Sequence, residues 1–252
     1  MSAHQVAVAA RISAAALFLG CGGGAVWAQA ATSAYPNMAP LAQYLSASRE
    51  DEIAFARSAA PPAIAKDAEI LVLGPKGYET AVKGTNGFVC LVDRPWDNNF
   101  DSPDFWNPKF RAPECFNGPA ARSFLPAYLR RTEWVLAGVS RAEMLARTKS
   151  AVAAHEIGAP EVGSMVYMMS KQGYLGDKVG GPWYPHVMVL LPRMAGSEWG
   201  ADLQGSPIFS DSTRPEPVTF FFVPVSRWSD GTPRSDAPTR SDGTQQASTH
   251  KH

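Results

Sequence analysis

Residues 69–92 read EILVLGPKGYETAVKGTNGFVCLV, and this stretch decides the fold class. Three runs of strand-forming residues, 69–73, 78–83 and 88–92, are separated by two glycine-rich turns. The Asn-Gly pair at 86–87 is the strongest short signal for a β-hairpin. We therefore expect three consecutive strands that pair as an antiparallel meander.

The rest of the chain adds strands and helices that are grouped rather than alternating. Three further runs are short and rich in strand formers, namely 164–170, 186–191 and 218–223. Helical patterns cover 39–45, 49–59, 125–138 and 140–157. Grouping of this kind is typical of α+β proteins. We predict a single-domain α+β fold, a mainly antiparallel sheet of about six strands with three or four helices.

Local signals mark where the helices begin and end. Ser48 suits the N-cap of one helix, and Pro61-Pro62 ends it. Pro126 suits a first helical turn. Ser140 followed by Glu143 matches a capping box at the start of another helix.

The N-terminus has the pattern of a signal peptide at residues 1–30. Arg11 precedes the apolar run 12–27, and Ala28-Gln29-Ala30 supplies small residues for cleavage. The run is too short and too rich in glycine for a good membrane-spanning helix, which needs about 20 apolar residues. We expect periplasmic or extracellular localisation. Two alternatives are a lipid anchor on Cys21, within Leu19-Gly20-Cys21, and an uncleaved membrane anchor.

The C-terminus is predicted to be a disordered polar tail at residues 226–252. It repeats Ser-Asp, and after Trp228 it has no apolar residue larger than alanine. Such a segment buries too little surface to offset its ordering entropy. The globular domain is therefore expected at 31–225, and no other segment approaches the length of a membrane span.

Charge and cysteine content restrict the partners and the compartment. The 23 Lys and Arg residues balance 23 Asp and Glu residues, so no nucleic-acid partner is expected. Once Cys21 is removed, Cys90 and Cys115 remain, and two cysteines in an exported chain predict a disulfide. A pair of free thiols is the alternative.

The common catalytic and cofactor motifs are missing. The sequence has no GxSxG, CxxC, P-loop or dinucleotide fingerprint. His155-Glu156 opens an HExxH pattern, but Ala159 replaces the second histidine. We therefore predict no cofactor and no metal site, and whether the protein is an enzyme stays open.

Two long loops contain the candidate binding residues. Residues 93–119 hold five prolines and six large aromatic residues, too many aromatics for a disordered loop. We expect this irregular loop to wrap the surface and bury Trp96, Phe105, Trp106 and Phe110. The second loop is 171–185. If the aromatic residues of the two loops are exposed instead, the candidate ligand-binding residues are Trp96, Trp106, Trp183 and Tyr184.

His186 is the candidate catalytic residue because it lies where the glycine-rich loop 171–185 meets a strand. A carboxylate partner would let it act as a general base, and Asp177, Glu161 and Glu198 are the candidates. The alternative is a structural histidine whose ring nitrogens are satisfied by the backbone or by a tyrosine.

These features support two functional hypotheses. The favoured one is a non-catalytic domain that binds an unknown small ligand or protein, because no catalytic constellation can be assembled from the motifs. The alternative is a hydrolase-like enzyme that uses His186 with a carboxylate in a cleft under the 171–185 loop.

Overall fold

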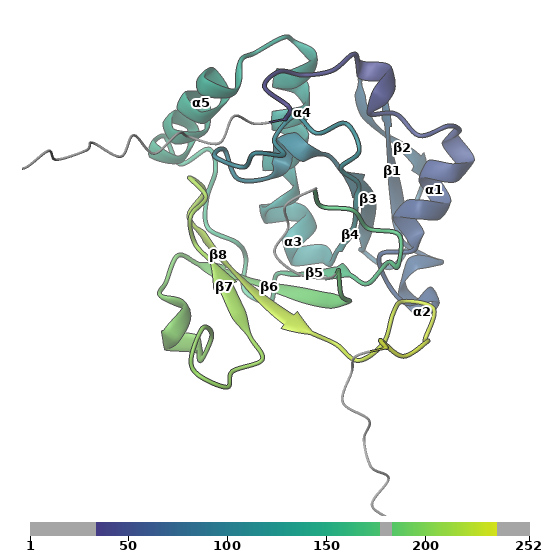
Figure 1. The fold of residues 1–252 in the computed structure, drawn as a ribbon, viewed down its shortest axis with the longest axis vertical. Coiled ribbons are helices and arrows are strands. Elements are labelled where there is room, and N and C mark those ends of the chain that lie inside the picture. The colour runs from purple at the N-terminus through teal and green to yellow at the C-terminus, as the bar shows by residue number, and fades with distance from the viewer. Residues whose placement is uncertain (1–33, 177–182, 236–252) are drawn as a thin grey trace, which may run out of the picture. The chain divides into compact units, whose positions relative to one another are not determined.

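The computed structural model describes residues 34–176 and 183–235, and they form one α+β fold (Figure 1). The predicted signal peptide 1–30 and the tail beyond residue 235 lie outside the described residues. The fold consists of one mixed sheet of eight strands with five α-helices and three short 3-10 helices. The prediction of α+β architecture is confirmed, although the sequence suggested six strands and fewer helices.

The sheet order is β2-β1-β3-β4-β5-β6-β8-β7. The strand bounds are β1 Glu69–Gly74, β2 Gly77–Val82, β3 Val89–Asp93, β4 Ala112–Phe116, β5 Met165–Met168, β6 His186–Pro192, β7 Phe209–Asp211 and β8 Val218–Pro224. All neighbouring strands pair antiparallel except β1 and β3, which are parallel.

The helices lie on both faces of the sheet (Figure 1). Their bounds are α1 Arg49–Arg57, α2 Pro62–Ala65, α3 Gly118–Ser123, α4 Leu125–Leu136 and α5 Arg141–Ala153, with 3-10 helices η1 Leu41–Gln43, η2 Pro95–Asp97 and η3 Gly196–Trp199. Helix α1 covers β1, β3 and β4, whereas α3 and α4 pack on the opposite face. The predicted helix at 39–45 is only the short η1.

The local helix signals act largely as predicted. Ser48 accepts a hydrogen bond from the Asp51 amide at 3.0 Å, and Ser140 accepts one from the Glu143 amide at 3.2 Å. These N-cap bonds satisfy amides that have no partner inside the helix. The Glu143 side chain does not complete the capping box, because it pairs with Arg147 on the next turn.

The predicted antiparallel pairing is confirmed for β1 with β2, but the predicted position of β3 next to β2 is wrong. The chain at 83–88 crosses the start of β1, where the Glu69 amide donates to the Phe88 carbonyl at 2.8 Å. Gly84 permits this crossing, because a Cβ there would lie 2.1 Å from the Glu69 nitrogen. β3 therefore joins the other side of β1, in parallel, where its side chains are buried.

The stretch 93–119, predicted to be an irregular loop, contains strand β4. Pro113 lies inside this strand, and its presence argues against a strand in the sequence, since proline is rare in central strands. Proline is tolerated here because β4 pairs with β5 only through Cys115 and Phe116. The predicted burial of Trp96, Phe105, Trp106 and Phe110 is confirmed.

The described chain also continues beyond the predicted domain boundary at residue 225. The Ser229 amide donates to the Met169 carbonyl at 2.9 Å, and Lys171 pairs with Asp230 at 2.7 Å. These contacts hold residues 226–235 against the domain, which composition alone did not indicate. None of the described helices is long and apolar enough to cross a membrane.

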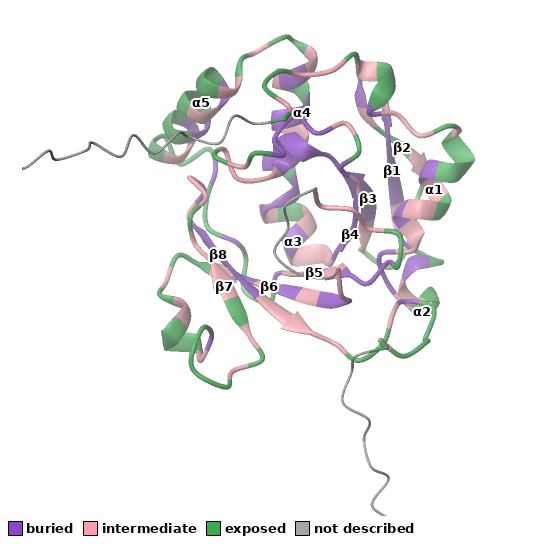
Figure 2. Ribbon diagram, in the orientation of Figure 1, coloured by how far each residue is buried: buried purple, intermediate pink, exposed green. Residues whose placement is uncertain are grey.

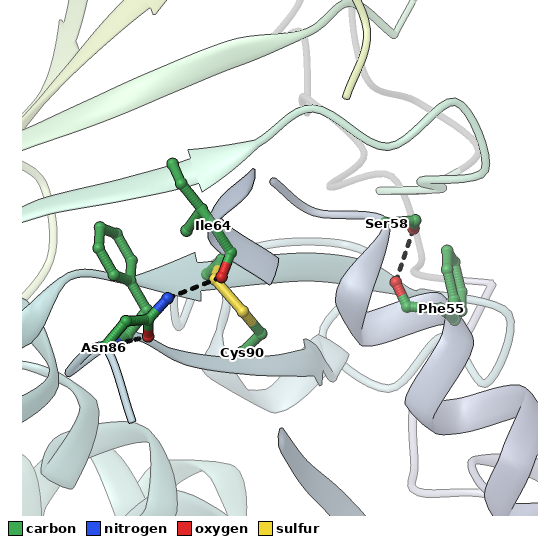
Figure 3. The surroundings of a disulfide bond; sticks show 7 residues. Phe55, Ser58, Ile64, Asn86 and Cys90 are labelled. Atoms are coloured by element: carbon green, nitrogen blue, oxygen red, sulfur yellow. Dashed lines mark hydrogen bonds between the residues drawn. A yellow bond between two sulfur atoms is a disulfide. The ribbon is translucent and has the colours of Figure 1, made fainter. Parts of the chain in front are cut away.

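Cys90 and Cys115 form the predicted disulfide, and they stand directly opposite each other on β3 and β4. Both are fully buried beneath α1 and α2, where Phe55 and Ile64 pack around them (Figure 3). Figure 2 shows that β3 and β4 are buried along nearly their whole length. The bond is typical of proteins in an oxidising compartment.

We predict that Cys90→Ser and Cys115→Ser lower the free energy of unfolding equally, each by about 3 kcal/mol, because either change opens the same loop. The double variant should lose little more, since both substitutions remove one bond. Urea denaturation measures all three, and reduced wild type is the matched control. Losses that add in the double variant would contradict a shared bond.

Candidate functional site

A cavity of about 230 Å³ lies on the sheet face that carries α4. Strands β3 to β8, helix α4 and the loops around them supply its lining side chains. Most of these side chains are apolar, but several carboxyl groups, one arginine and one histidine also line it. An apolar pocket with a few convergent polar groups is the usual form of a small-molecule site.

Strand alternation explains why two acidic residues face this cavity. Glu114 is paired with Leu91, and Asp93 is paired with Ala112. Successive side chains point to opposite faces of a sheet, so Glu114 and Ala112 share the face of Asp93 and Leu91. The disulfide occupies the other face, beneath α1.

The carboxyl groups of Asp93 and Glu114 are buried, each with 3% of its surface exposed. Burial raises the pKa of Asp93 to about 6, although hydrogen bonding to Asp97 and the Arg94 amide opposes the rise. Burial, followed by the charge of Asp93, raises the pKa of Glu114 well above its usual range. Asp97 lies behind Asp93, and burial and Asp93 raise its pKa as well. Burial therefore favours the neutral forms of these carboxyl groups while no cation lies beside them.

Arg214 is the one guanidinium among the described lining residues. It donates to the Asp97 carbonyl and lies 4.8 Å from the centre of the Phe220 ring. Burial lowers its pKa, but Tyr128, Glu216 and Asp211 outweigh that effect and raise it. Asp211 has a lowered pKa, because hydrogen bonds from Thr213 and Asn99 outweigh its burial. Arg214 and Asp211 are therefore both charged at the cavity.

His186 lies in the cavity wall at the start of β6, at the strand–loop border expected from the sequence. Its Nδ1 lies 3.0 Å from the Tyr184 carbonyl oxygen, which can only accept, so Nδ1 carries the hydrogen. Burial lowers the pKa of His186 to about 4, which leaves the ring neutral. Nε2 is then a buried acceptor, and it has no hydrogen-bond partner in the described chain.

Aromatic rings form a continuous wall beside His186. Phe209 stacks on Phe222 with ring centres 4.7 Å apart, and Tyr184 lies against Phe209 at 6.1 Å. Trp183 meets His186 edge-on at 5.4 Å, and its indole donates to the Ser170 carbonyl at 2.6 Å. Two of the predicted binding residues, Trp183 and Tyr184, are therefore brought together in this site.

The other two predicted binding residues lie elsewhere, in the core. Trp96 is fully buried, and its indole donates to the Thr132 hydroxyl at 2.9 Å. Trp106 packs edge-on against Phe105 at 4.8 Å and is 7% exposed. Both belong to the cluster between α4, α5 and the 93–111 segment, and neither lines the cavity.

None of the carboxylate partners proposed for His186 lines the cavity in the described chain. Glu161 is on the surface, where it pairs with Arg122 at 2.7 Å. Glu198 is exposed in η3 and accepts from the Ala195 amide. Asp177 lies outside the described residues. The acidic residues near His186 are instead Asp93, Glu114 and Asp211, all of which line the same cavity.

Sequence reasoning missed Asp93, Glu114 and Arg214. One signal was available, because Asp93 directly follows a buried strand and Glu114 interrupts the run APECF. Charged residues inside such runs are costly to bury, so they are candidates for a polar site. Nothing near Arg214 in the sequence indicates that it would lie in this cavity.

Two further clusters of buried charge are ion pairs. Arg94 binds both oxygens of Glu52 at 2.7 and 2.9 Å, and Arg131 binds Glu216 at 2.5 Å. Both pairs are buried in the fold and do not line the cavity. Within residues 34–176 and 183–235, no three His, Cys, Asp or Glu side chains are grouped closely enough to hold a metal ion.

We predict that the free energy of unfolding of Asp93→Asn increases relative to that of wild type as pH rises. Because burial raises this pKa from 3.8 to about 6, folded wild type binds more protons than the unfolded chain within that window, so it loses stability as pH rises. The amide cannot ionise, so the stability of the variant relative to wild type should increase by about 3 kcal/mol between pH 4 and pH 8. His186 titrates in both proteins, and its contribution cancels. Urea denaturation across this range measures the difference, and a constant difference would contradict the prediction.

Comparisons with protein-family models, with curated proteins and with solved structures find no match to this chain. The cavity and the side chains that line it are therefore the features that bear on function. Its most informative features are the buried carboxyl groups, the acceptor nitrogen of His186 and the aromatic wall.

Proposed function

We propose that this protein is an exported, non-catalytic binding protein that holds a small molecule in the cavity between the sheet and α4. The observation that carries the proposal is a cavity of about 230 Å³ lined by apolar side chains around buried polar groups. A cavity of about 150 Å³ accommodates benzene, so this one suits a ligand of roughly ten non-hydrogen atoms.

Buried polar atoms without partners support a ligand over simple packing. Nε2 of His186 and Oε2 of Glu114 are buried in side chains that line the cavity, and neither has a hydrogen-bond partner among the described residues. An unpaired buried polar group costs roughly 1–3 kcal/mol, so such groups in native proteins usually serve a purpose. A ligand that satisfies them would recover that free energy on binding.

Export is supported by the disulfide and by the N-terminal sequence. The Cys90–Cys115 bond favours an oxidising compartment. The signal-peptide pattern at residues 1–30 is consistent with the same destination. These two features support an exported binding protein that acts in the periplasm or outside the cell.

A hydrolase-like enzyme is the second candidate, and one observation favours it. Asp93 and Glu114 have raised pKa values beside a cavity, which is the property required of a general acid. His186 is less suited to the role of general base, because its Nδ1 bonds to a backbone carbonyl and its pKa is about 4. Incubation with an identified ligand, followed by mass spectrometry, separates turnover from binding.

We predict that Leu175→Trp abolishes ligand binding, because a bulkier side chain at this half-buried lining position would fill the cavity. Leu203→Trp is the matched control, since Leu203 is 52% exposed and lies outside the cavity. A fragment library is screened by thermal shift, because a ligand that binds the folded state raises the melting temperature.

Compounds should stabilise wild type and Leu203→Trp but not Leu175→Trp. Native mass spectrometry of the same mixtures then gives the mass and stoichiometry of each complex. A set of ligands that binds Leu175→Trp as well as wild type would contradict the proposed site. So would a screen in which no compound binds wild type.

A further inference from the structure

The lining of the cavity is unbalanced in charge. Among the described lining residues, the carboxyl groups of Asp93, Glu114 and Asp211 face one guanidinium, that of Arg214. Asp211 has a lowered pKa that Arg214 helps to maintain, so these two charges offset each other. Arg214 also lowers the pKa values of Asp93 and Glu114, so its one charge is shared among three carboxyl groups, while Arg94 is already bound to Glu52. Two buried acidic groups at the inner end of an apolar cavity favour a positively charged guest.

The unpartnered atoms in the wall support the same conclusion. A cation beside Glu114 favours its ionised form, in which Oε2 is an acceptor, and Nε2 of His186 is an acceptor because Nδ1 holds the hydrogen. A guest that satisfies both must therefore donate hydrogen bonds. Arg214 Nε is a third unpartnered atom, and it is a donor. This N–H can bind an acceptor group on the guest. A single N–H cannot satisfy both Glu114 Oε2 and His186 Nε2.

The aromatic wall suits a cation with an apolar body. The faces of Trp, Tyr and Phe attract cations, and their area shields an apolar group from water. Phe209 and Phe222 provide such surfaces next to His186, whereas the Tyr184 ring already has the Arg234 guanidinium 5.1 Å from its centre. Across the described chain, grouped side chains of the metal-binding kind are absent, which favours an organic cation over a metal ion.

We propose that the ligand of this cavity carries a protonated amine on a small apolar or aromatic body. The amine donates to Glu114 and His186 and lies close to Asp93, while the body packs against the aromatic wall. This inference rests on the proposed function, because it names the chemical class of the ligand that the binding protein holds.

Three probes of similar size test this inference, namely phenethylamine, phenethyl alcohol and hydrocinnamate. They share a phenyl ring and a short chain, and they end in a cation, a neutral hydroxyl and an anion. Isothermal titration calorimetry should show the amine binding about tenfold more tightly than the alcohol, the value of one charge-assisted hydrogen bond. Hydrocinnamate should bind more weakly than either, because its charge meets Asp93 and Glu114.

Variants then identify the groups responsible. Glu114→Gln and Asp93→Asn should each remove most of the preference for the amine over the alcohol, because each removes a negative charge. In these variants the amine should lose more affinity than the alcohol, because only the amine carries a charge. Glu161→Gln is the matched control, since it makes the same chemical change on the surface, and it should keep the full preference.

The outcomes separate this inference from the proposed function. Equal binding of amine and alcohol, or tightest binding of hydrocinnamate, overturns the amine and leaves a binding protein. Failure of all three probes, while other compounds bind wild type but not Leu175→Trp, does the same. If no compound distinguishes wild type from Leu175→Trp, the binding function itself fails.

Amine affinity should also fall as pH falls from about 8 to 5, because protonation removes the negative charge that attracts the cation. The pKa of Asp93 is about 6, so much of the loss should occur near that pH. The charged or titratable groups around Asp93 and Glu114 are Asp97, Arg94, Arg214, Tyr128, Asp211 and His186. His186 stays neutral in this range because its pKa is about 4.

Calorimetry at each pH measures both probes, and the alcohol should bind equally throughout. An amine affinity that is independent of pH would contradict the role of the carboxyl groups. Equal losses for amine and alcohol would instead indicate a change in the cavity as a whole, and would also overturn the inference.

Discussion

The direct pairing of Cys90 with Cys115 is the constraint on which the rest of the structure depends. It holds β3 and β4 in one register, and that register places Asp93 and Glu114 on the same face. A slip of one residue would turn every β4 side chain to the opposite face. Glu114 would then lie under α1 among apolar residues, and the cavity would lose one of its acidic groups. The covalent bond therefore fixes the arrangement of a site that lies on the other side of the sheet.

Buried ionisable side chains have two kinds of surroundings in this fold. Arg94 with Glu52, and Arg131 with Glu216, form ion pairs in which opposite charges offset the cost of removing both from water. The cavity differs, because burial dominates its carboxyl groups and raises their pKa values. Such groups reduce stability when they ionise, and evolution tolerates this cost chiefly at functional sites. The contrast within one molecule is the physical basis for placing function at the cavity.

Sequence patterns predict six of the eight described strands and the three longest helices, because apolar runs, caps and turn residues act locally. They miss β4, where Pro113 argues against a strand, and the three-residue β7. They also misplace β3, because the Asn-Gly turn cannot show which side of β1 the chain will join. For the site, the strand–loop border located His186, but its neighbours come from distant segments. Only tertiary packing brings Glu114 and Arg214 to the same cavity.

Trp183 gives the molecule an optical reporter of its own. Of the six described tryptophans, Trp183 alone lines the cavity, where it lies against the His186 ring, while Trp96 and Trp106 are enclosed in the core. Indole emission responds to the polarity and the charges around the ring, so the light from Trp183 depends on what fills the space beside it. Intrinsic fluorescence can therefore follow occupancy in the unmodified protein, without a dye or a label.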